Sequence, residues 1–205
     1  MTDAELLAIF LRVGVVGISA VGLARELLQQ FGSMAGVVAA PREAFCAVHG
    51  MGEAKYVQLQ ASVELARRAL ASAMSERPLL NTPAIVKDYL RLSLAHEQVE
   101  VFVALWLDAQ HKLIDAQVLF RGTLTQTSVY AREVVRAALA KNAAGVILAH
   151  NHPSGGSSPS QADRSLTRQL KDALALIDVA VLDHCIVGRG ESDTSVRSMA
   201  MMGEM

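Results

Sequence analysis

The chain has 205 residues, of which 52% are hydrophobic and 19% charged, a composition that excludes bulk disorder and suits one ordinary domain with a small second one. The formal net charge of −1 excludes a general attraction to nucleic acids or anionic membranes. Two distant cysteines, no leader peptide and no apolar run near about 18 residues predict a cytoplasmic protein without a disulfide scaffold or membrane span.

The N-terminal part predicts a small all-α domain over residues 1–75. Apolar residues recur at helical spacing in two sets. The first set is Leu6, Leu7, Phe10 and Leu11, and the second is Val21, Leu23, Leu27 and Leu28. Ser19 is placed to cap the second helix and Gly32 to end it. A short helix over 42–48 and a longer one from 53 to about 73 follow.

The junction of these last two helices, Val48-His-Gly50-Met-Gly52-Glu-Ala-Lys55, resembles a helix-hairpin-helix motif. Its glycines allow a tight turn, and amides at the next helix start can bind a DNA phosphate without sequence preference. Gly50, Gly52 and Lys55 are therefore candidate phosphate contacts. The alternative is a plain turn between helices, used for packing or for a protein partner.

Prolines 78 and 83, without any periodicity between them, predict a linker at 76–83. A second domain over 84–198 and a frayed tail at 199–205 would follow. Strand-like runs at 100–107, 112–120, 145–150, 179–182 and 185–187 alternate with helical segments at 82–95, 128–141 and 160–176. The first two strands form a hairpin around residues 108–111. This alternation predicts a layered α/β domain.

The most specific pattern places His150 and His152 at the end of a short apolar strand, followed by Ser160 and Asp163 at the start of a helix. Residues two apart in a strand point to the same side, so both imidazoles can face one point. Three ligands with an open fourth position are what a catalytic Zn²⁺ requires. The structural alternative is that Ser160 and Asp163 only form a capping box.

The spacing His150-x-His152-x7-Ser160-x2-Asp163 resembles the motif of the JAMM (JAB/MPN) metalloprotease superfamily. Further blocks are similar to the bacterial RadC family (UPF0758-type), over about 82–190 and in the N-terminal part. These blocks are His150-Asn-His-Pro-Ser-Gly155, Pro159-Ser-Gln-Ala-Asp163, Phe120-Arg-Gly-Thr123, Ala131-Arg-Glu-Val134 and Asp183-His-Cys-Ile-Val187. The resemblance implies a three-layer, cytidine-deaminase-like α/β fold with Zn²⁺ held by His150, His152 and Asp163.

The resemblance also implies roles in catalysis. In similar proteases a glutamate on an earlier strand is the general base, and the motif serine stabilises the oxyanion. Glu100 is the candidate base because it opens a strand-like run, with Glu97 as its competitor and a solvated surface glutamate as the alternative. Ser160 is the candidate oxyanion donor. The implied reaction is hydrolysis of an amide or isopeptide bond in a peptide or protein substrate.

Two other functions are alternatives to a metalloprotease. A nucleobase deaminase would need His-x-Glu followed by Pro-Cys-x-x-Cys, but position 152 is His and no such cysteine pair exists. The second is a DNA-associated accessory protein with a non-catalytic zinc site. His184 could orient a ligand imidazole, although a structural histidine fits the sequence equally well.

Overall fold

The computed structural model describes residues 1–79, 82–122, 129–189 and 193–205. The chain divides into two compact units, Met1–Ala66 and Arg67–Met205, and the division falls within the long helix α5, Glu53–Glu76. Each unit has its own hydrophobic core. The predicted linker at 76–83 lies partly outside the described residues, which exclude 80 and 81.

The first unit is helical, as the sequence predicts. It contains α1 (Asp3–Leu11), α2 (Ala20–Phe31), α3 (Met34–Ala39), α4 (Arg42–Cys46) and the first part of α5. The Ser19 hydroxyl caps α2 by accepting a hydrogen bond from the Gly22 amide at 3.1 Å, and Gly32 ends the helix with φ of 82°. Both predicted helix signals are confirmed. Helix α3, capped by Ser33, had not been distinguished in the sequence.

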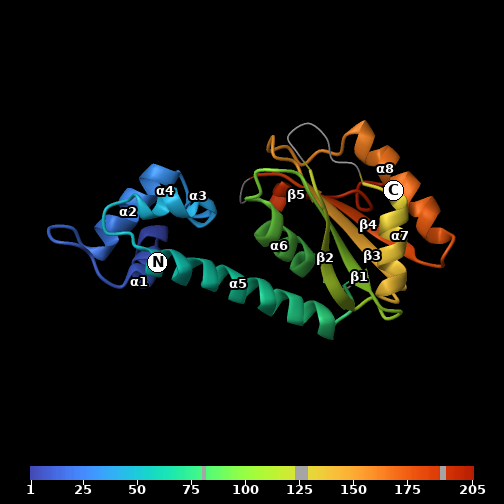
Figure 1. Cartoon of the computed structure of the whole chain (residues 1–205), viewed down its shortest axis with the longest axis horizontal. Helices are drawn as coiled ribbons and strands as arrows, with labels where there is room; N and C mark the ends of the chain where they lie inside the picture. Colours follow the sequence, from blue (N-terminus) through green and yellow to red (C-terminus); the bar gives the residue numbers. More distant parts are fainter. Residues whose placement is uncertain (80–81, 123–128, 190–192) are drawn as a thin grey trace. The chain divides into compact units, whose positions relative to one another are not determined.

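The second unit is built on a five-stranded mixed sheet in the order β2-β1-β3-β4-β5 (Figure 1). The strands are β1 (Val101–Leu107), β2 (Leu113–Arg121), β3 (Gly145–Asn151), β4 (Ala180–Val187) and β5 (Val196–Ser198). Strands β3 and β4 are parallel, and the other neighbouring pairs are antiparallel. Helix α8 (Gln161–Ala175) makes the crossover that a parallel pair requires.

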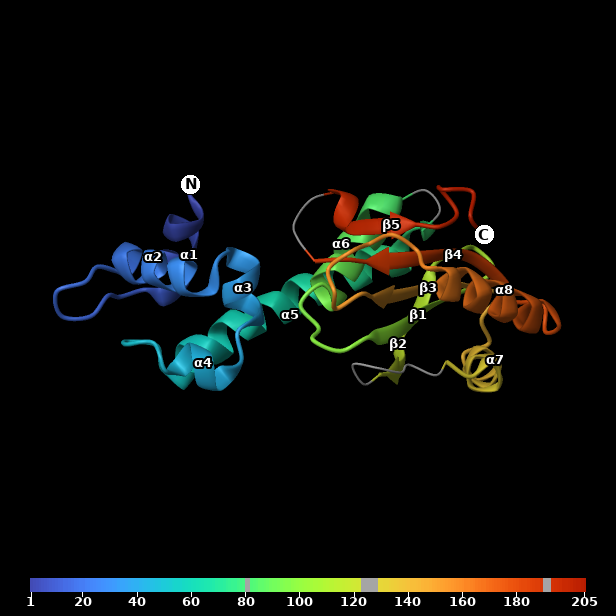
Figure 2. The ribbon, with the colours of Figure 1, turned by 90° about the horizontal axis from the view of Figure 1, so that it is seen from above.

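The sheet separates two helical layers (Figures 1 and 2). All seven residues of β1 are buried, because both faces of the strand are covered. Val103 and Leu105 belong to the core beneath α6 (Pro83–Leu94), whereas Phe102 and Trp106 belong to the core beneath α7 (Ala131–Ala140) and α8. The predicted three-layer α/β arrangement is confirmed.

Several boundaries differ from the prediction. Residues 129 and 130 precede α7 rather than belonging to it, and the predicted start at Ser128 lies outside the described residues. Strand β4 is continuous through Asp183, where the apolar pattern in the sequence breaks. The short strand β5 was not predicted, because its three residues gain their partners only from β4.

Residues 199–205 were expected to fray, but they form a turn that packs on the rest of the second unit. Met199 is fully buried, and the Glu204 amide donates to the Met199 carbonyl at 2.9 Å. Arg164 of α8 makes an ion pair with the Glu204 carboxylate at 2.8 Å. Among the described residues, no helix has the length and apolar character needed to cross a membrane.

Candidate metal centre

Strand β3 delivers the two histidines to one end of the sheet. It lies between β1 and β4, and its seven residues are all buried, including His150 at 1% exposure. The His150 ring stacks on Phe102 with ring centroids 6.0 Å apart, on the face covered by α8. His152 follows the strand, and its amide donates to the Val187 carbonyl of β4 at 2.9 Å. Both backbones are therefore fixed by the sheet.

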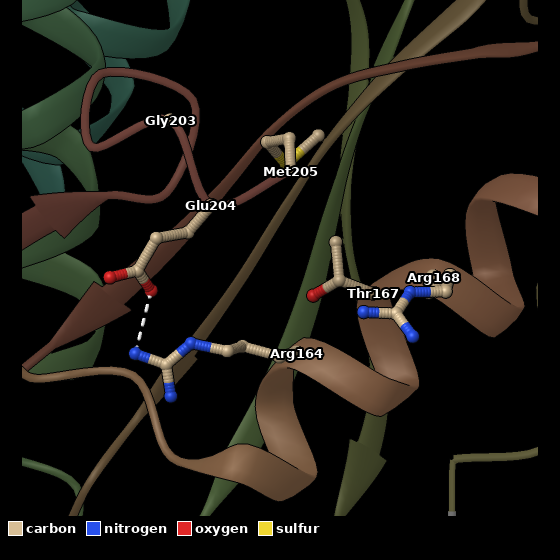
Figure 3. Close-up of a pocket in the computed structure, with 6 residues that line it drawn as sticks. All are labelled: Arg164, Thr167, Arg168, Gly203, Glu204 and Met205. Carbon is tan, nitrogen blue, oxygen red and sulfur yellow. Dashed lines mark ion pairs between the residues drawn. The ribbon is translucent and has the colours of Figure 1, made fainter.

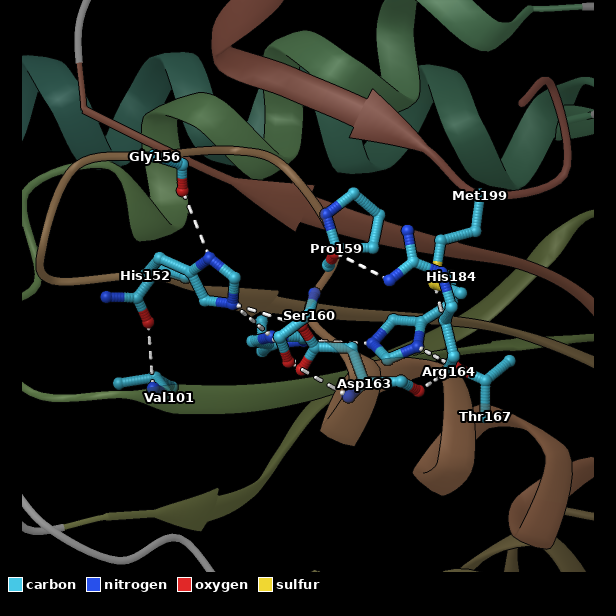
Figure 4. Close-up of polar contacts among 12 residues, drawn as sticks. Val101, His152, Gly156, Pro159, Ser160, Asp163, Arg164, Thr167, His184 and Met199 are labelled. Atoms are coloured by element: carbon cyan, nitrogen blue, oxygen red, sulfur yellow. Dashed lines mark hydrogen bonds and ion pairs between the residues drawn. The ribbon is translucent and has the colours of Figure 1, made fainter. Parts of the chain in front are cut away.

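Helix α8 delivers Asp163 from its first turn. The Ser160 hydroxyl accepts from the Asp163 amide at 3.2 Å, and the Asp163 carboxylate accepts from the Ser160 amide at 2.6 Å. This is the capping box that the sequence allowed as the structural alternative. It does not exclude a ligand role, because the carboxylate it orients also faces His152 (Figure 4) and lies 3.1 Å from His150 Nε2.

The three side chains converge on one point. Asp163 Oδ1 lies 3.1 Å from His150 Nε2, and Asp163 Oδ2 lies 3.4 Å from His152 Nε2. The two histidine Nε2 atoms are 3.0 Å apart. One candidate ligand atom from each residue lies within 4.8 Å of the others, so the group could hold a metal ion.

A chain of hydrogen bonds determines which nitrogen of His150 carries its proton. The Thr167 hydroxyl donates its single proton to the Asp163 carbonyl at 2.6 Å, and its oxygen can then accept from His184 Nδ1, also at 2.6 Å. His184 Nε2 is thereby left to accept from His150 Nδ1 at 2.9 Å. His150 Nε2 therefore presents a lone pair at the point of convergence, as a metal ligand must.

His152 is oriented in the same way from the other side. Its Nδ1 donates to the Gly156 carbonyl at 3.1 Å, which leaves Nε2 without a proton when the ring is neutral. The loop that carries Gly156 is held in turn by the segment after β4. The Arg189 amide donates to the Gly155 carbonyl at 3.0 Å, and the Ser157 hydroxyl donates to the Thr194 carbonyl at 2.7 Å.

The electrostatics of the cluster favour a cation. The hydrogen bond that His152 can donate to Asp163 raises the pKa of His152 above its ordinary value, although burial acts in the opposite direction. Burial alone would raise the pKa of Asp163, but hydrogen bonds from His150 and His152 lower it well below its usual range. Two lone pairs 3.0 Å apart beside an ionised carboxylate repel one another unless a proton or a metal ion lies between them. The donor set of two imidazoles and one carboxylate fits a zinc ion.

The two candidate glutamates occupy different environments. Glu97 is engaged by Arg121, whose two terminal guanidinium nitrogens reach its carboxylate oxygens at 3.0 and 3.1 Å. Glu100 is half-buried and immediately precedes β1. Its charge contributes to the raised pKa of His152, so its carboxylate lies within electrostatic reach of the cluster. The environment therefore favours Glu100 over Glu97.

Two residues of the centre were missed or undervalued in the sequence. Thr167 lies four residues after Asp163, and therefore on the same face of α8, a spacing that could have identified it. For His184, the sequence allowed a purely structural role as readily as contact with a ligand histidine. Its contact with His150 depends on the parallel pairing of β3 and β4, which places Leu148 opposite His184 and is not readable from local sequence.

A separate hollow of about 280 Å³ lies beside α8 (Figure 3). Its lining residues are Arg164, Thr167, Arg168, Gly203, Glu204 and Met205. The ion pair between Arg164 and Glu204 crosses this region. Thr167 lines the hollow and also contacts His184, so the hollow lies next to the hydrogen-bond chain of the candidate metal centre.

The three candidate phosphate contacts lie together at the turn before α5. Gly50 has φ of 77°, and a Cβ at Gly52 would meet nothing within 4 Å. Lys55, however, directs its ammonium back to the Gly50 carbonyl at 2.8 Å, and Glu53 is paired with Arg42 at 2.8 Å. The turn is therefore open at Gly52 but carries little positive charge.

The buried His184 predicts an acid sensitivity of the second unit. Burial lowers the pKa of His184 to about 3 from its ordinary 6.5. Between these values the unfolded chain binds the proton and the folded chain does not, so the free energy of unfolding should fall as the pH falls, by at most about 1.4 kcal/mol per pH unit. His152 acts oppositely, because its pKa is raised.

The measurement is urea unfolding of the metal-free protein between roughly pH 7 and pH 4, followed by the fluorescence of Trp106, the single tryptophan. His184→Gln should show a smaller loss of stability on acidification than the unsubstituted protein. Equal losses in the two proteins would show that His184 is not the group responsible.

Comparison with known proteins identifies the family. A RadC-like JAB domain matches residues 80–202, and the UPF0758 N-terminal family matches residues 1–57. A UPF0758 protein of Ectopseudomonas mendocina is 56% identical over 205 residues, which cover 100% of this chain and 90% of that protein.

Two further relatives carry the same family name. A UPF0758 protein of Aromatoleum aromaticum is 61% identical over 187 residues, covering 91% of this chain and 83% of that protein. A UPF0758 protein of Thiobacillus denitrificans is 58% identical over 187 residues, covering 91% of this chain and 84% of that protein. The histidine and aspartate triad therefore lies in a JAB domain of the JAMM type. The chain belongs to the RadC-like JAB-domain family of UPF0758 proteins.

Proposed function

We propose that this protein is a zinc-dependent hydrolase of the JAMM metalloprotease type, which cleaves an amide or isopeptide bond in a peptide or protein substrate. The observation that carries the proposal is the convergence of His150, His152 and Asp163 on one point. The two unpaired cysteines suit a reducing compartment, and we expect the reaction to occur in the cytoplasm.

Zinc is the metal that these ligands favour. Imidazole nitrogen and carboxylate oxygen are both common zinc ligands, and a catalytic site takes three protein ligands with one position left for water or substrate. Within the described residues the cluster has these three members. When bound, zinc would polarise the scissile carbonyl and make a water molecule more acidic.

Glu100 is the proposed general base. Its carboxylate would take a proton from the attacking water and later pass one to the leaving amine nitrogen, a role worth typically 10² to 10⁴ in rate. Its half-buried position before β1 and its electrostatic effect on His152 support this assignment. Glu97 is less suited, because Arg121 already occupies its carboxylate.

Ser160 is the proposed oxyanion donor. Its oxygen accepts the Asp163 amide proton, and its own hydroxyl proton remains available to an oxygen of the substrate. The residue is exposed, so a substrate could reach it. A well-placed donor of this kind contributes roughly 3 kcal/mol to stabilisation of the transition state.

The ligand assignment predicts that His152→Ala will not bind zinc stoichiometrically. Removal of one of three ligands should lower metal affinity on the order of 100-fold or more. Zinc content after dialysis, measured by atomic absorption, tests the loss. The first unit should stay folded, because its core of Leu7, Leu23, Leu27 and Phe45 is separate from the site. Full zinc occupancy in the variant would disprove the assignment.

The catalytic assignment predicts opposite results for the two glutamates. Glu100→Gln should lower kcat at least about 100-fold while retaining zinc, because the amide cannot accept the proton. Glu97→Gln is the matched control and should stay within about threefold of the unsubstituted protein. The assay uses the zinc-loaded protein with a library of internally quenched peptides that includes lysine isopeptides. Chelator-insensitive cleavage, or equal rates for both variants, would refute the proposal.

A second function, non-specific DNA binding through the first unit, is favoured by one observation. Gly52 leaves open space beside the start of the 24-residue helix α5, where backbone amides can meet a phosphate. In this case the protein would be a DNA-associated accessory factor, and Gly50, Gly52 and Lys55 would line the contact.

Fluorescence anisotropy with a duplex oligonucleotide at increasing salt tests this function. Phosphate contact predicts that affinity falls steeply with salt, and that Gly52→Val weakens binding about tenfold or more by blocking the approach. Lys55→Gln should have a smaller effect, since this ammonium already bonds the Gly50 carbonyl. Absence of binding at low salt would exclude the function.

A further inference from the structure

We propose that Asn151, the residue between the two histidines, is a positioning residue that holds Glu100 at the metal centre. The proposal rests on the hydrolase function proposed above. Asn151 itself cannot join the ligands, since neighbouring residues of a strand point to opposite sides. Its side chain is directed instead toward the segment that leads into β1.

The amide of Asn151 makes three hydrogen bonds to the backbone of that segment. Its Oδ1 accepts from the Val101 amide at 2.8 Å. Its Nδ2 donates to the Val99 carbonyl at 3.0 Å and to the Glu97 carbonyl at 3.3 Å. The bonds to Val99 and Val101 fix the residues on both sides of Glu100.

These bonds are needed because the ladder between β1 and β3 stops short of Glu100. The last paired residues are Phe102 and His150. Beyond them, the Asn151 side chain supplies the link that the backbone of β3 no longer provides. On the other side, the Gly122 amide donates to the Glu100 carbonyl at 2.8 Å. Glu100 is thus held between β2 and the strand that carries the histidines.

An asparagine is the residue that this position requires. Its amide offers an acceptor to Val101 and two donors to the carbonyls, whereas an aspartate would present only acceptors. The residue is 2% exposed, so water cannot replace the lost bonds without entering the core.

The test compares Asn151→Ala with a matched control, Asp108→Ala. Asp108 Oδ1 accepts two backbone amides, Gln110 at 2.8 Å and Lys112 at 2.9 Å, in the hairpin at the other end of β1. Asn151→Ala should keep one zinc ion per chain and lower kcat about 100-fold, since a shift near 1 Å can cost that much. KM should change by less than about threefold, because substrate-binding groups are untouched.

Hydrogen exchange at the Val101 amide provides a readout that needs neither metal nor substrate. In the unsubstituted protein this amide should be protected, and in Asn151→Ala its exchange should accelerate on the order of tenfold or more. Asp108→Ala should leave both Val101 protection and kcat unchanged. Equal kcat losses in the two variants, or unchanged protection in Asn151→Ala, would overturn the proposal.

These experiments distinguish failure of the positioning role of Asn151 from failure of the proposed hydrolase function. If Asn151→Ala does not fold, rapid exchange of Val101 in the unsubstituted protein would by itself overturn the positioning role. If Glu100→Gln retains full activity, the hydrolase assignment fails and Asn151 loses its proposed catalytic purpose. The exchange data would in that case show separately whether the side chain still holds the segment.

Discussion

Two histidine nitrogens held 3.0 Å apart beside a carboxylate form the contact on which the candidate metal centre depends. Three electron-rich atoms repel one another at such distances, and the repulsion is relieved only by a cation. The surrounding structure holds the three side chains together against that repulsion. The sheet fixes the histidine backbones, the helix cap fixes the carboxylate, and neutral hydrogen-bond partners fix the rings.

Several residues of the centre serve both folding and the site. Ser160 begins α8 as its N-cap, and the same capping box directs the Asp163 carboxylate. Thr167 bonds the helix backbone through its proton and His184 through its oxygen. A change at any of these residues therefore alters helix stability and ligand orientation together, which is why the cap and the ligand cannot be treated as competing explanations.

The sequence predicted those parts of the molecule that depend on local chemistry. Helical spacing and the capping residues Ser19 and Gly32 located α2, and the two-residue spacing of His150 and His152 at the end of an extended run predicted that both face one point. Parts that depend on distant pairing were not predictable or, for His184, were left as one of two alternatives. Strand β5, the contact of His184 with His150, and the attachment of Asn151 to Val101 all join residues brought together only by the folded sheet. The sequence favoured Glu100 over Glu97 only by its place at the start of a strand, because the contact of Arg121 with Glu97 comes from another strand.

The parallel pairing of β3 with β4 also has a consequence for biosynthesis. Its registered residues lie 35 or 36 positions apart, with all of α8 between them. Pairings of this kind close late, after the intervening chain has left the ribosome and folded. The histidines of the cluster are translated before Asp163 and well before His184, so a nascent chain first presents two of the three candidate ligands, in undefined orientation. The arrangement of three ligands that could hold a metal ion should therefore form only after β4 has been synthesised and paired with β3.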